Sequence, residues 1–417
     1  MTKPLFSVII PACNRWDLTE ACLRSLAAHS GDTACEVIVV DNGSTDETAA
    51  ALEPLGSALF GSAFLRLRHD DNRNYAAGCN AGARAAAADL LFFLNNDTLL
   101  TPGFAPPLLR ALADNPGVGI VGPLLLYPQN DRVQHIGVAV HPVSIQHLYR
   151  HFPAAHPVVR RSRSLQAITA AALLMPAALF AACGMFCEEY RNGFEDIELC
   201  HRALQAGTTP AVATDSIVYH FESQSQGRNA HDADNASLFL RRCGQALLPD
   251  YHRMALDDGY LPRFTPTLSV ELRLPPEHEE AMPDPRTDVQ AAYEALLREP
   301  MWRDGYPLVQ RQLESAGHTD AALALCLLER ALYPDGDTLL RLAKMATRRK
   351  NAALAKEAAD ALRAYESAAR DPVFIAQRER HVEKTAAETR DEALTAMLLE
   401  WRQGRNHFQP KEPPCTP

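Results

Sequence analysis

The sequence lacks several features by which a protein class is often recognised. Basic residues are not in excess: the formal net charge is −10 at pH 7, which argues against broad nucleic-acid binding. Ten cysteines are present, but no two Cys-x-x-Cys pairs stand at zinc spacing, and no second pair follows Cys183 and Cys187. No signal-like segment precedes the first apolar run at Phe6. We therefore expect reduced thiols, no zinc site of this kind and a cytoplasmic protein.

Charge is absent from one long stretch, residues 164–187, which a hydropathy window would mark as a membrane helix. The stretch is rich in alanine, and Pro176 and Gly184 interrupt it. A buried strand followed by a short helix with proline at its start explains the same pattern. We predict core rather than a membrane span, which leaves peripheral association with the inner face of a membrane open.

Short apolar runs alternate with helical patterns in the first part of the chain. Strands are predicted at 6–11, 36–41, 64–67 and 90–94, and helices at 17–29, 47–55 and 81–88. This alternation is typical of βαβ units in a mostly parallel sheet. The first turn reads Pro-Ala-Cys-Asn-Arg and lacks the G-x-G-x-x-G pattern of dinucleotide-binding folds, which disfavours a dehydrogenase.

Three polar residues, Asn95, Asn96 and Asp97, follow the apolar strand 90–94. Ligands of parallel sheets bind beyond the carboxyl ends of the strands. One carboxylate after two amides suits a Mg²⁺-like ion that also carries phosphates, because such ions take few protein ligands. An ordinary turn or helix cap has the same composition, so this run alone decides nothing.

Two further stretches could carry chemistry. Helical spacing after Phe194 puts Glu195 and Asp196 at a helix N-terminus, where the charged form of a carboxylate is stabilised, as a general base requires. Plain helix capping is the alternative. His220 closes a strand predicted from residue 215 and is a candidate ligand or phosphate contact, although most single histidines are structural or solvated.

Six segments, taken together and in order over roughly residues 5–245, resemble the inverting family-2 glycosyltransferases. The likeness is greatest to the bacterial branch of rhamnosyl- and galactofuranosyltransferase-like enzymes. The segments are Ser-Val-Ile-Ile-Pro at 7–11 with Asn14 and Arg15, Val-Val-Asp-Asn-Gly-Ser-Thr-Asp at 39–46, Asn-Arg-Asn-Tyr at 72–75 through Asn80-Ala81-Gly82, Phe-Leu-Asn-Asn-Asp-Thr at 93–98, Phe-Glu-Asp-Ile-Glu-Leu-Cys at 194–200, and Val-Tyr-His at 218–220.

The resemblance implies a GT-A fold, which is an α/β fold with a mostly parallel central sheet and helices on both faces. It implies that Asp97 and His220 hold a divalent ion, Mn²⁺ or Mg²⁺, and that Asp196 is the catalytic base. Asp41 would hydrogen-bond the nucleotide base, and Pro11 would line its pocket. The full set implied to bind the nucleotide-sugar donor is Pro11, Asn14, Arg15, Asp41, Asn42, Arg73, Asn80, Asn95, Asn96 and Glu195.

The sequence departs from the family pattern in two places. Asn95 and Asn96 stand where many relatives have Asp, so metal affinity could be lower and an Asn could contact ribose instead. Asn74 stands where Gly is common. Since Asn tolerates positive φ better than most residues, we expect the turn to be kept.

The character of the chain changes after residue 250. We predict a glycosyltransferase domain at 1–250, a proline-rich linker at 251–287, a helical domain at 288–405 and a disordered tail at 406–417. Helix pairs at about 306–333 and 337–368, separated by turns at 315–318, 333–336 and 348–351, resemble tetratricopeptide repeats. Such a region could bind a protein partner, form a homodimer or simply cover the catalytic domain.

The sequence therefore predicts an inverting glycosyltransferase that moves a hexose from a UDP- or dTDP-sugar to a glycan, a lipid-linked glycan or a protein. The alternative is a scaffold whose transferase-like domain has weakened chemistry and which binds partners through its helices. Retention of Asp97, Asp196 and His220 argues against the scaffold, and the Asn95-Asn96 pair argues for it.

Overall fold

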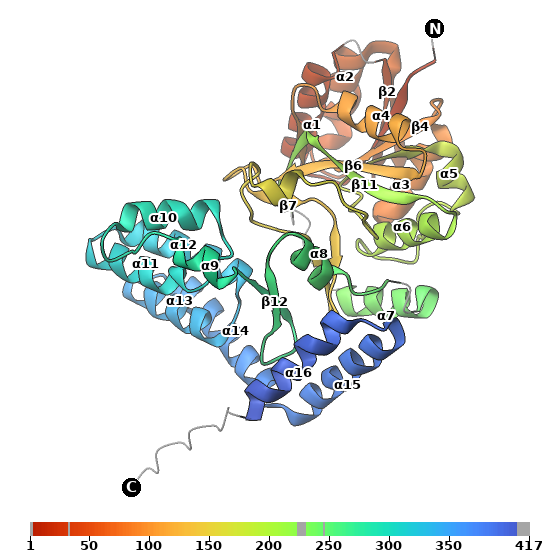
Figure 1. The fold of residues 1–417 in the computed structure, drawn as a ribbon. Coiled ribbons are helices and arrows are strands. Elements are labelled where there is room, and N and C mark those ends of the chain that lie inside the picture. Colours follow the sequence, from red (N-terminus) through yellow and green to blue (C-terminus); the bar gives the residue numbers. More distant parts are fainter. Residues whose placement is uncertain (1–2, 32–33, 223–230, 245–246, 407–417) are drawn as a thin grey trace. The chain divides into compact units, whose positions relative to one another are not determined.

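The computed structural model describes residues 3–31, 34–222, 231–244 and 247–406 (Figure 1). The chain forms two compact units. The first contains the residues up to Ala139, His147–Arg150 and Pro157–Leu247. The second contains Val140–Gln146, His151–His156 and the chain from Leu248 onward. The predicted tail falls, apart from residue 406, outside the described residues.

The first unit is built on a nine-stranded sheet in the order β3-β2-β1-β4-β10-β6-β11-β5, with β7 paired to β6. Strands β3, β2, β1, β4, β6 and β11 run in one direction, and β10, β5 and β7 run in the other. The strand bounds are β1 Phe6–Ala12, β2 Cys35–Asn42, β3 Phe64–His69, β4 Leu90–Leu94, β5 Thr98–Leu100, β6 Val118–Leu126, β7 Val133–His135, β10 Ala172–Pro176 and β11 Thr209–His220. A separate ribbon pairs β8 Val138–Val140 with β9 Ile145–His147.

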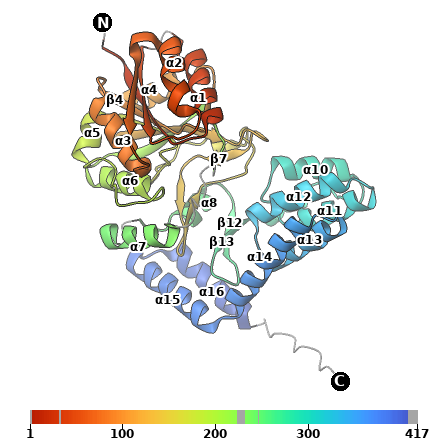
Figure 2. The same cartoon turned by 180° about the vertical axis from the view of Figure 1, so that it is seen from behind.

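Helices cover both faces of this sheet because successive strand residues point to opposite sides. Val8 and Ile10 of β1 share one apolar cluster with Leu23 of α1 (Trp16–His29). Ile9 points the other way, toward Gly82 of α3 (Asn74–Ala85), where an added Cβ would lie 2.5 Å from Ile9 Cγ2. Both views show α1 and α2 on the opposite side of the sheet from α3 and α6 (Figures 1 and 2).

The other helices of the first unit are short. They are α2 Thr48–Phe60, η1 Gly61–Ala63, α4 Ala105–Asp114, η2 Pro157–Arg160, α5 Ala177–Ala182, α6 Glu195–Gln205 and α7 Asp232–Cys243. The uncharged stretch 164–187 contains strand β10 and helix α5, as predicted. None of the described helices combines the length and apolar character needed to span a bilayer.

The second unit is mainly helical. Its elements are α8 Tyr251–Asp257, β12 Leu261–Phe264, β13 Val270–Arg273, α9 Pro276–Glu280, α10 Val289–Arg298, α11 Gly305–Ser315, α12 Thr319–Leu332, α13 Gly336–Arg348, α14 Ala352–Arg370, α15 Pro372–Thr389 and α16 Glu392–Asn406. The segment 251–287, predicted to be a linker, holds the first four of these. The predicted fold class, α/β followed by an all-α region, is confirmed; the domain boundaries remain predictions.

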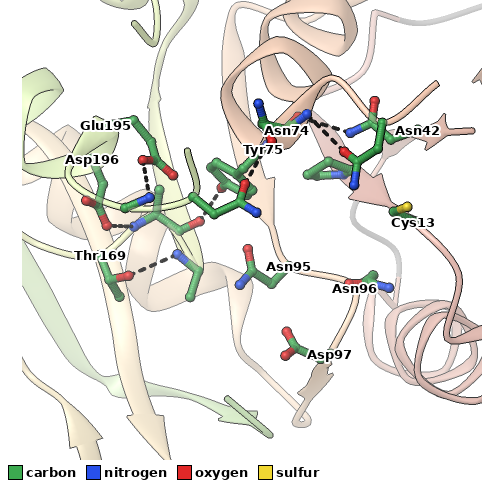
Figure 3. A pocket seen from close by; sticks show the side chains of 17 residues that line it. Cys13, Asn42, Asn74, Tyr75, Asn95, Asn96, Asp97, Thr169, Glu195 and Asp196 are labelled. Carbon is green, nitrogen blue, oxygen red and sulfur yellow. Dashed lines mark hydrogen bonds between the residues drawn. The ribbon is translucent and has the colours of Figure 1, made fainter. Parts of the chain in front are cut away.

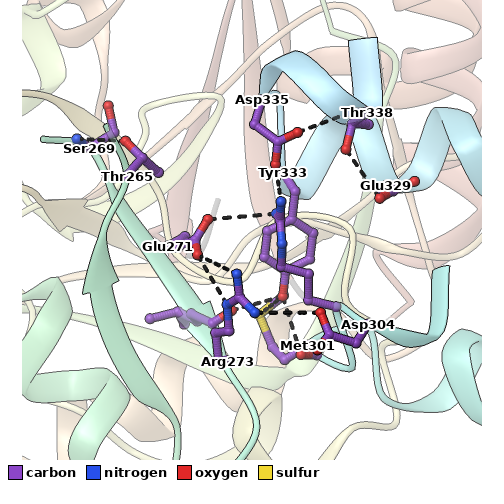
Figure 4. Close-up of polar contacts among 12 residues, drawn as sticks. Thr265, Ser269, Glu271, Arg273, Met301, Asp304, Glu329, Tyr333, Asp335 and Thr338 are labelled. Atoms are coloured by element: carbon purple, nitrogen blue, oxygen red, sulfur yellow. Dashed lines mark hydrogen bonds and ion pairs between the residues drawn. The ribbon is translucent and has the colours of Figure 1, made fainter. Parts of the chain in front are cut away.

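Polar contacts fasten the β12–β13 hairpin to the helices within the second unit (Figure 4). The Arg303 guanidinium lies 4.8 Å from the centroid of the Tyr333 ring and pairs with Asp335, which caps α13. Arg303 also lies 3.6 Å from Glu271 of β13, and Tyr333 Oη donates to Leu272 O at 2.8 Å. These contacts satisfy charges that would otherwise be costly at this half-buried joint.

Candidate active site

A cleft in the first unit opens at the carboxyl ends of β1, β2 and β4, as expected for a parallel sheet (Figure 3). It holds about 950 Å³ of empty space, part of it open solvent. Eleven of the lining residues carry an amide, an acid or a hydroxyl group, which suits a polar ligand. The lining comprises Pro11, Ala12, Cys13, Asn42, Asn72, Asn74, Tyr75, Asn95, Asn96, Asp97, Thr169, Ala170, Ala171, Asn192, Gly193, Glu195 and Asp196.

The turn between β4 and β5 brings Asn95, Asn96 and Asp97 to the cleft. The turn is fixed by its backbone, because Asn95 N donates to Ala171 O at 2.9 Å and Thr98 Oγ1 donates to Asn95 O at 2.7 Å. Asn96 Nδ2 donates to Thr19 Oγ1 of α1 at 2.9 Å. These contacts fix the backbone of the turn at Asn95 and the side chain of Asn96.

His220 lies beside Asp97 because β11 pairs with β5 in antiparallel register, His220 opposite Thr98. His220 Nε2 is 3.1 Å from Asp97 Oδ1 and 3.3 Å from Asn95 Nδ2. A nitrogen and an oxygen bound at right angles to one ion, each about 2.1 Å from it, would be about 3 Å apart, so the pair fits one divalent ion. No cluster of three or more His, Cys, Asp or Glu suited to a metal occurs among the described residues. Phosphates and water would have to complete the coordination.

Helix α6 places two acids at the opposite wall of the cleft. Phe194, which precedes the helix, has φ 76°, a conformation that bulky residues rarely adopt. Glu195 is buried, and its Oε2 accepts from Gly193 N at 2.6 Å. Asp196 Oδ2 accepts from Ala170 N at 3.1 Å, and Oδ1 accepts from its neighbour's amide, Ile197 N, at 2.8 Å. The helix N-terminus and these amides favour the charged carboxylate.

Asp41 is the next-to-last residue of β2, but it has no exposed surface and is not part of the cleft lining. Its Oδ2 accepts from Arg66 Nη2 and Arg68 Nη1, both at 2.6 Å, and its Oδ1 accepts from Ser44 N at 2.8 Å. Burial raises the pKa of Asp41, but the Ser44 hydrogen bonds and the two arginines outweigh burial and leave the pKa below its usual value. The contact with a nucleotide base remains a prediction that this burial does not favour.

Four other residues expected at the donor are engaged outside the cleft lining. Asn14 Oδ1 accepts from the Thr45 amide at 2.8 Å. Asn80 is buried and bonds the Phe186 backbone, donating to its oxygen at 2.9 Å and accepting from its nitrogen at 3.0 Å. The other two are arginines that pair with neighbouring acids, Arg15 with Asp17 and Arg73 with Asp71. Pro11, Asn42, Asn95, Asn96 and Glu195 do line the cleft.

Several lining residues were not singled out from the sequence. Tyr75 Oη donates to Ala170 O at 2.6 Å, its backbone amide donates to Asn192 Oδ1 at 3.0 Å, and burial raises its pKa well above the usual value. Tyr75 follows Asn74 within a segment that resembles the family, which was an available signal. Cys13 also lines the cleft, but burial and the nearby acids Asp41 and Asp46 raise its pKa, which disfavours the thiolate form.

The chain is similar to known glycosyltransferases. Residues 7–158 match the family described as Glycosyl transferase family 2. The chain is 31% identical over 243 residues to the O-antigen biosynthesis protein RfbC of Myxococcus xanthus, covering 54% of this chain and 18% of that protein. It is 29% identical to the validoxylamine A glucosyltransferase of Streptomyces hygroscopicus subsp. jinggangensis, covering 59% and 63%. The chain thus spans less than two thirds of either relative.

Among solved structures, GalNAc-T7 with UDP, GalNAc and Mn²⁺ aligns with a TM-score of 0.45 at 15% identity, covering 61% of this chain and 54% of that one.

Proposed function

We propose, from the match of residues 7–158 to glycosyl transferase family 2, that the protein transfers a sugar from a nucleotide-diphosphate donor to a hydroxyl acceptor. The observation that supports this best is the convergence of Asp97 and Asp196 on one cleft from opposite walls. One acid with His220 would hold a divalent ion, and the other would serve as base. The donor would be a UDP- or dTDP-hexose, and the acceptor a glycan, a lipid-linked glycan or a protein.

The leaving diphosphate would be stabilised on the side of Asp97 and His220. A divalent ion at this pair, Mn²⁺ or Mg²⁺, would neutralise charge that develops on the diphosphate. Asn95 and Asn96, fixed by the turn that carries Asp97, would hydrogen-bond the donor without adding negative charge beside the phosphates.

The acceptor would be activated on the side of Asp196. A sugar hydroxyl is a weak nucleophile until a base removes its proton. Asp196 accepts a backbone hydrogen bond on each oxygen, from Ala170 N and Ile197 N, and these bonds hold the carboxylate in the lining of the cleft, where an acceptor hydroxyl would approach. Attack from the face opposite the diphosphate gives single displacement with inversion.

The decisive test compares Asp196→Asn with Glu195→Gln, its neighbour in the same helix turn. Asp196→Asn keeps the shape of the side chain and should reduce turnover by a factor of about 10² to 10⁴, the usual contribution of a general base. Donor binding, followed as a thermal shift, should persist because the donor contacts remain. Unchanged turnover in Asp196→Asn, with a large loss in Glu195→Gln, would transfer the role of base to Glu195.

The donor can be identified with a panel of nucleotide sugars, each measured by thermal shift with and without Mn²⁺. A true donor at free concentration L stabilises the protein by RT ln(1 + L/Kd), so the Tm should keep rising with the logarithm of the donor concentration once this exceeds the dissociation constant. If no member of the panel stabilises the protein under either condition, the scaffold alternative gains and the transferase proposal fails.

A further inference from the structure

His220 is not part of the cleft lining, but one of its ring nitrogens lies beside Asp97, which lines the cleft, and the other lies beside a buried glutamine. Gln134 and His220 are 2% and 4% exposed. Gln134 lies in β7, where Leu125 of β6 pairs with His135 but the next residue, Leu126, pairs with Val133. Gln134 is therefore skipped in the ladder, and such irregularities redirect a side chain, often near active sites.

The hydrogen bonds of Gln134 determine which of its amide atoms faces the ring. Gln134 Nε2 donates to the backbone oxygen of His220 at 3.0 Å. The amide oxygen, Oε1, is consequently the atom that lies 2.6 Å from His220 Nδ1. Because an amide oxygen only accepts, Nδ1 must carry the proton. A neutral His220 then has an unprotonated Nε2, which lies 3.3 Å from Asn95 Nδ2, an N–H donor, and 3.1 Å from Asp97 Oδ1, a carboxylate oxygen that only accepts. The Nε2 lone pair and this carboxylate repel each other unless a cation lies between them, which is what a divalent ion at this pair would supply.

We propose that Gln134 is a positioning residue that holds neutral His220 in the Nδ1-protonated tautomer, so that the Nε2 lone pair is directed at the Asp97 side of the cleft. The effect of Gln134 on a bound metal ion rests on the function proposed above, whereas its effect on the tautomer of His220 does not. Histidine ligands of metals commonly donate their second nitrogen to an oxygen acceptor, which fixes the ring and its tautomer. Here the acceptor is a neutral amide that clamps both the ring and the backbone of the same residue.

The direct test is the tautomer of His220 in the metal-free protein. Nitrogen NMR of ¹⁵N-histidine-labelled protein at pH 9, where imidazoles are neutral, separates the two forms, and loss of the signal in His220→Gln assigns it. The wild type should show Nδ1-protonated His220. Gln134→Leu, which removes the acceptor at similar size, should shift His220 toward the Nε2-protonated form. Nε2-protonated His220 in the wild type, or the same tautomer in both proteins, would overturn the proposal.

The second measurement is Mn²⁺ affinity with a nucleoside diphosphate, read from free Mn²⁺ by electron paramagnetic resonance. Gln134→Leu should weaken binding about 10- to 100-fold, and Gln134→Glu, which keeps an acceptor oxygen, should recover most of it. Gln310→Leu is the matched control, since it removes another buried glutamine with a 2.7 Å bond, to Glu329, in the second unit. Equal affinity in Gln134→Leu and wild type contradicts the positioning role.

These outcomes separate the inference from the proposed function. Wild-type protein that binds no Mn²⁺ would refute the metal at Asp97 and His220, whereas the tautomer measurement would still decide the role of Gln134. If Gln134→Leu does not fold, the wild-type tautomer alone decides it.

Discussion

Replacing Asp41 by Asn tests whether this residue supports the fold or contacts the donor. The substitution keeps the size of the side chain and an acceptor for the Ser44 amide. It removes the charge shared by Arg66 and Arg68, whose side chains are 16% and 44% exposed. Arg66 is the costly partner, because it would stay largely buried without a counter-charge. Arg68 can turn to water, so its loss should matter little.

The magnitude follows from this difference in exposure. Leaving one buried partner of an ion pair uncompensated costs about 3–5 kcal/mol, and we expect the lower end, about 3 kcal/mol, because Arg66 retains some contact with water. For a unit of this size, each kcal/mol corresponds to about 2–4 °C in Tm, which gives a fall of about 6–12 °C. Calorimetry resolves this change if the two units melt separately.

The double variant Asp41→Asn with Arg66→Met supplies the control. Removing the stranded cation should recover part of the lost Tm, because the penalty belongs to the uncompensated charge rather than to the missing carboxylate. A fall of less than about 2 °C in Asp41→Asn, accompanied by a large loss of donor affinity, would refute this reasoning and establish Asp41 as a contact of the nucleotide base.

Three further predictions follow from pKa and packing. The folded pKa of Asp41 lies below 3.8, so the charged carboxylate stabilises the fold above pH 3.8, and this stabilisation is lost as the pH falls through the folded pKa. The difference in unfolding free energy between wild type and Asp41→Asn should therefore shrink on acidification, as urea titrations from about pH 6 to 3 would show. Gly82→Ala should lower the unfolding free energy by about 1–3 kcal/mol through the clash with Ile9, whereas Gly117→Ala, with open space around it, should change little in the same calorimetric assay. Leu394→Ala should cost about 2–5 kcal/mol because this residue is fully buried in an apolar cluster of the second unit, whereas Leu399→Ala, 52% exposed in the same helix, should stay within about 0.5 kcal/mol.

Local patterns in the sequence predicted the elements well. The turns at 315–318, 333–336 and 348–351 separate helices α11 to α14 as expected. Asn74 has φ 66°, which confirms the expectation of a positive φ at this position. Helix α3 begins at Asn74 rather than at residue 81, because its Asn and Gly residues have low helix propensity and obscured the start.

Long-range register could not be derived from the sequence. The arginines on Asp41 come from β3, whose parallel alignment sets Asp41 opposite Arg68 and Val39 opposite Arg66. The partner of Asn80 lies 106 residues away. Gln134 reaches His220 only because β7 skips a residue against β6. Local periodicity carries no information on any of these pairings.

The interleaving of the two units limits how the chain can be divided. The short segment Val140–Gln146 belongs to the second unit although it is encoded between parts of the first. The backbone of Val140 makes two hydrogen bonds with Asp250. Val140 N donates to Asp250 Oδ1 at 2.8 Å, and Val140 O accepts from Asp250 N at 2.9 Å. A protein truncated after residue 247 would retain Val140 but lose Asp250, and with it both hydrogen bonds. Recombination that swaps the helical region between homologues would have to exchange this inserted segment as well, so the two modules are expected to be inherited together.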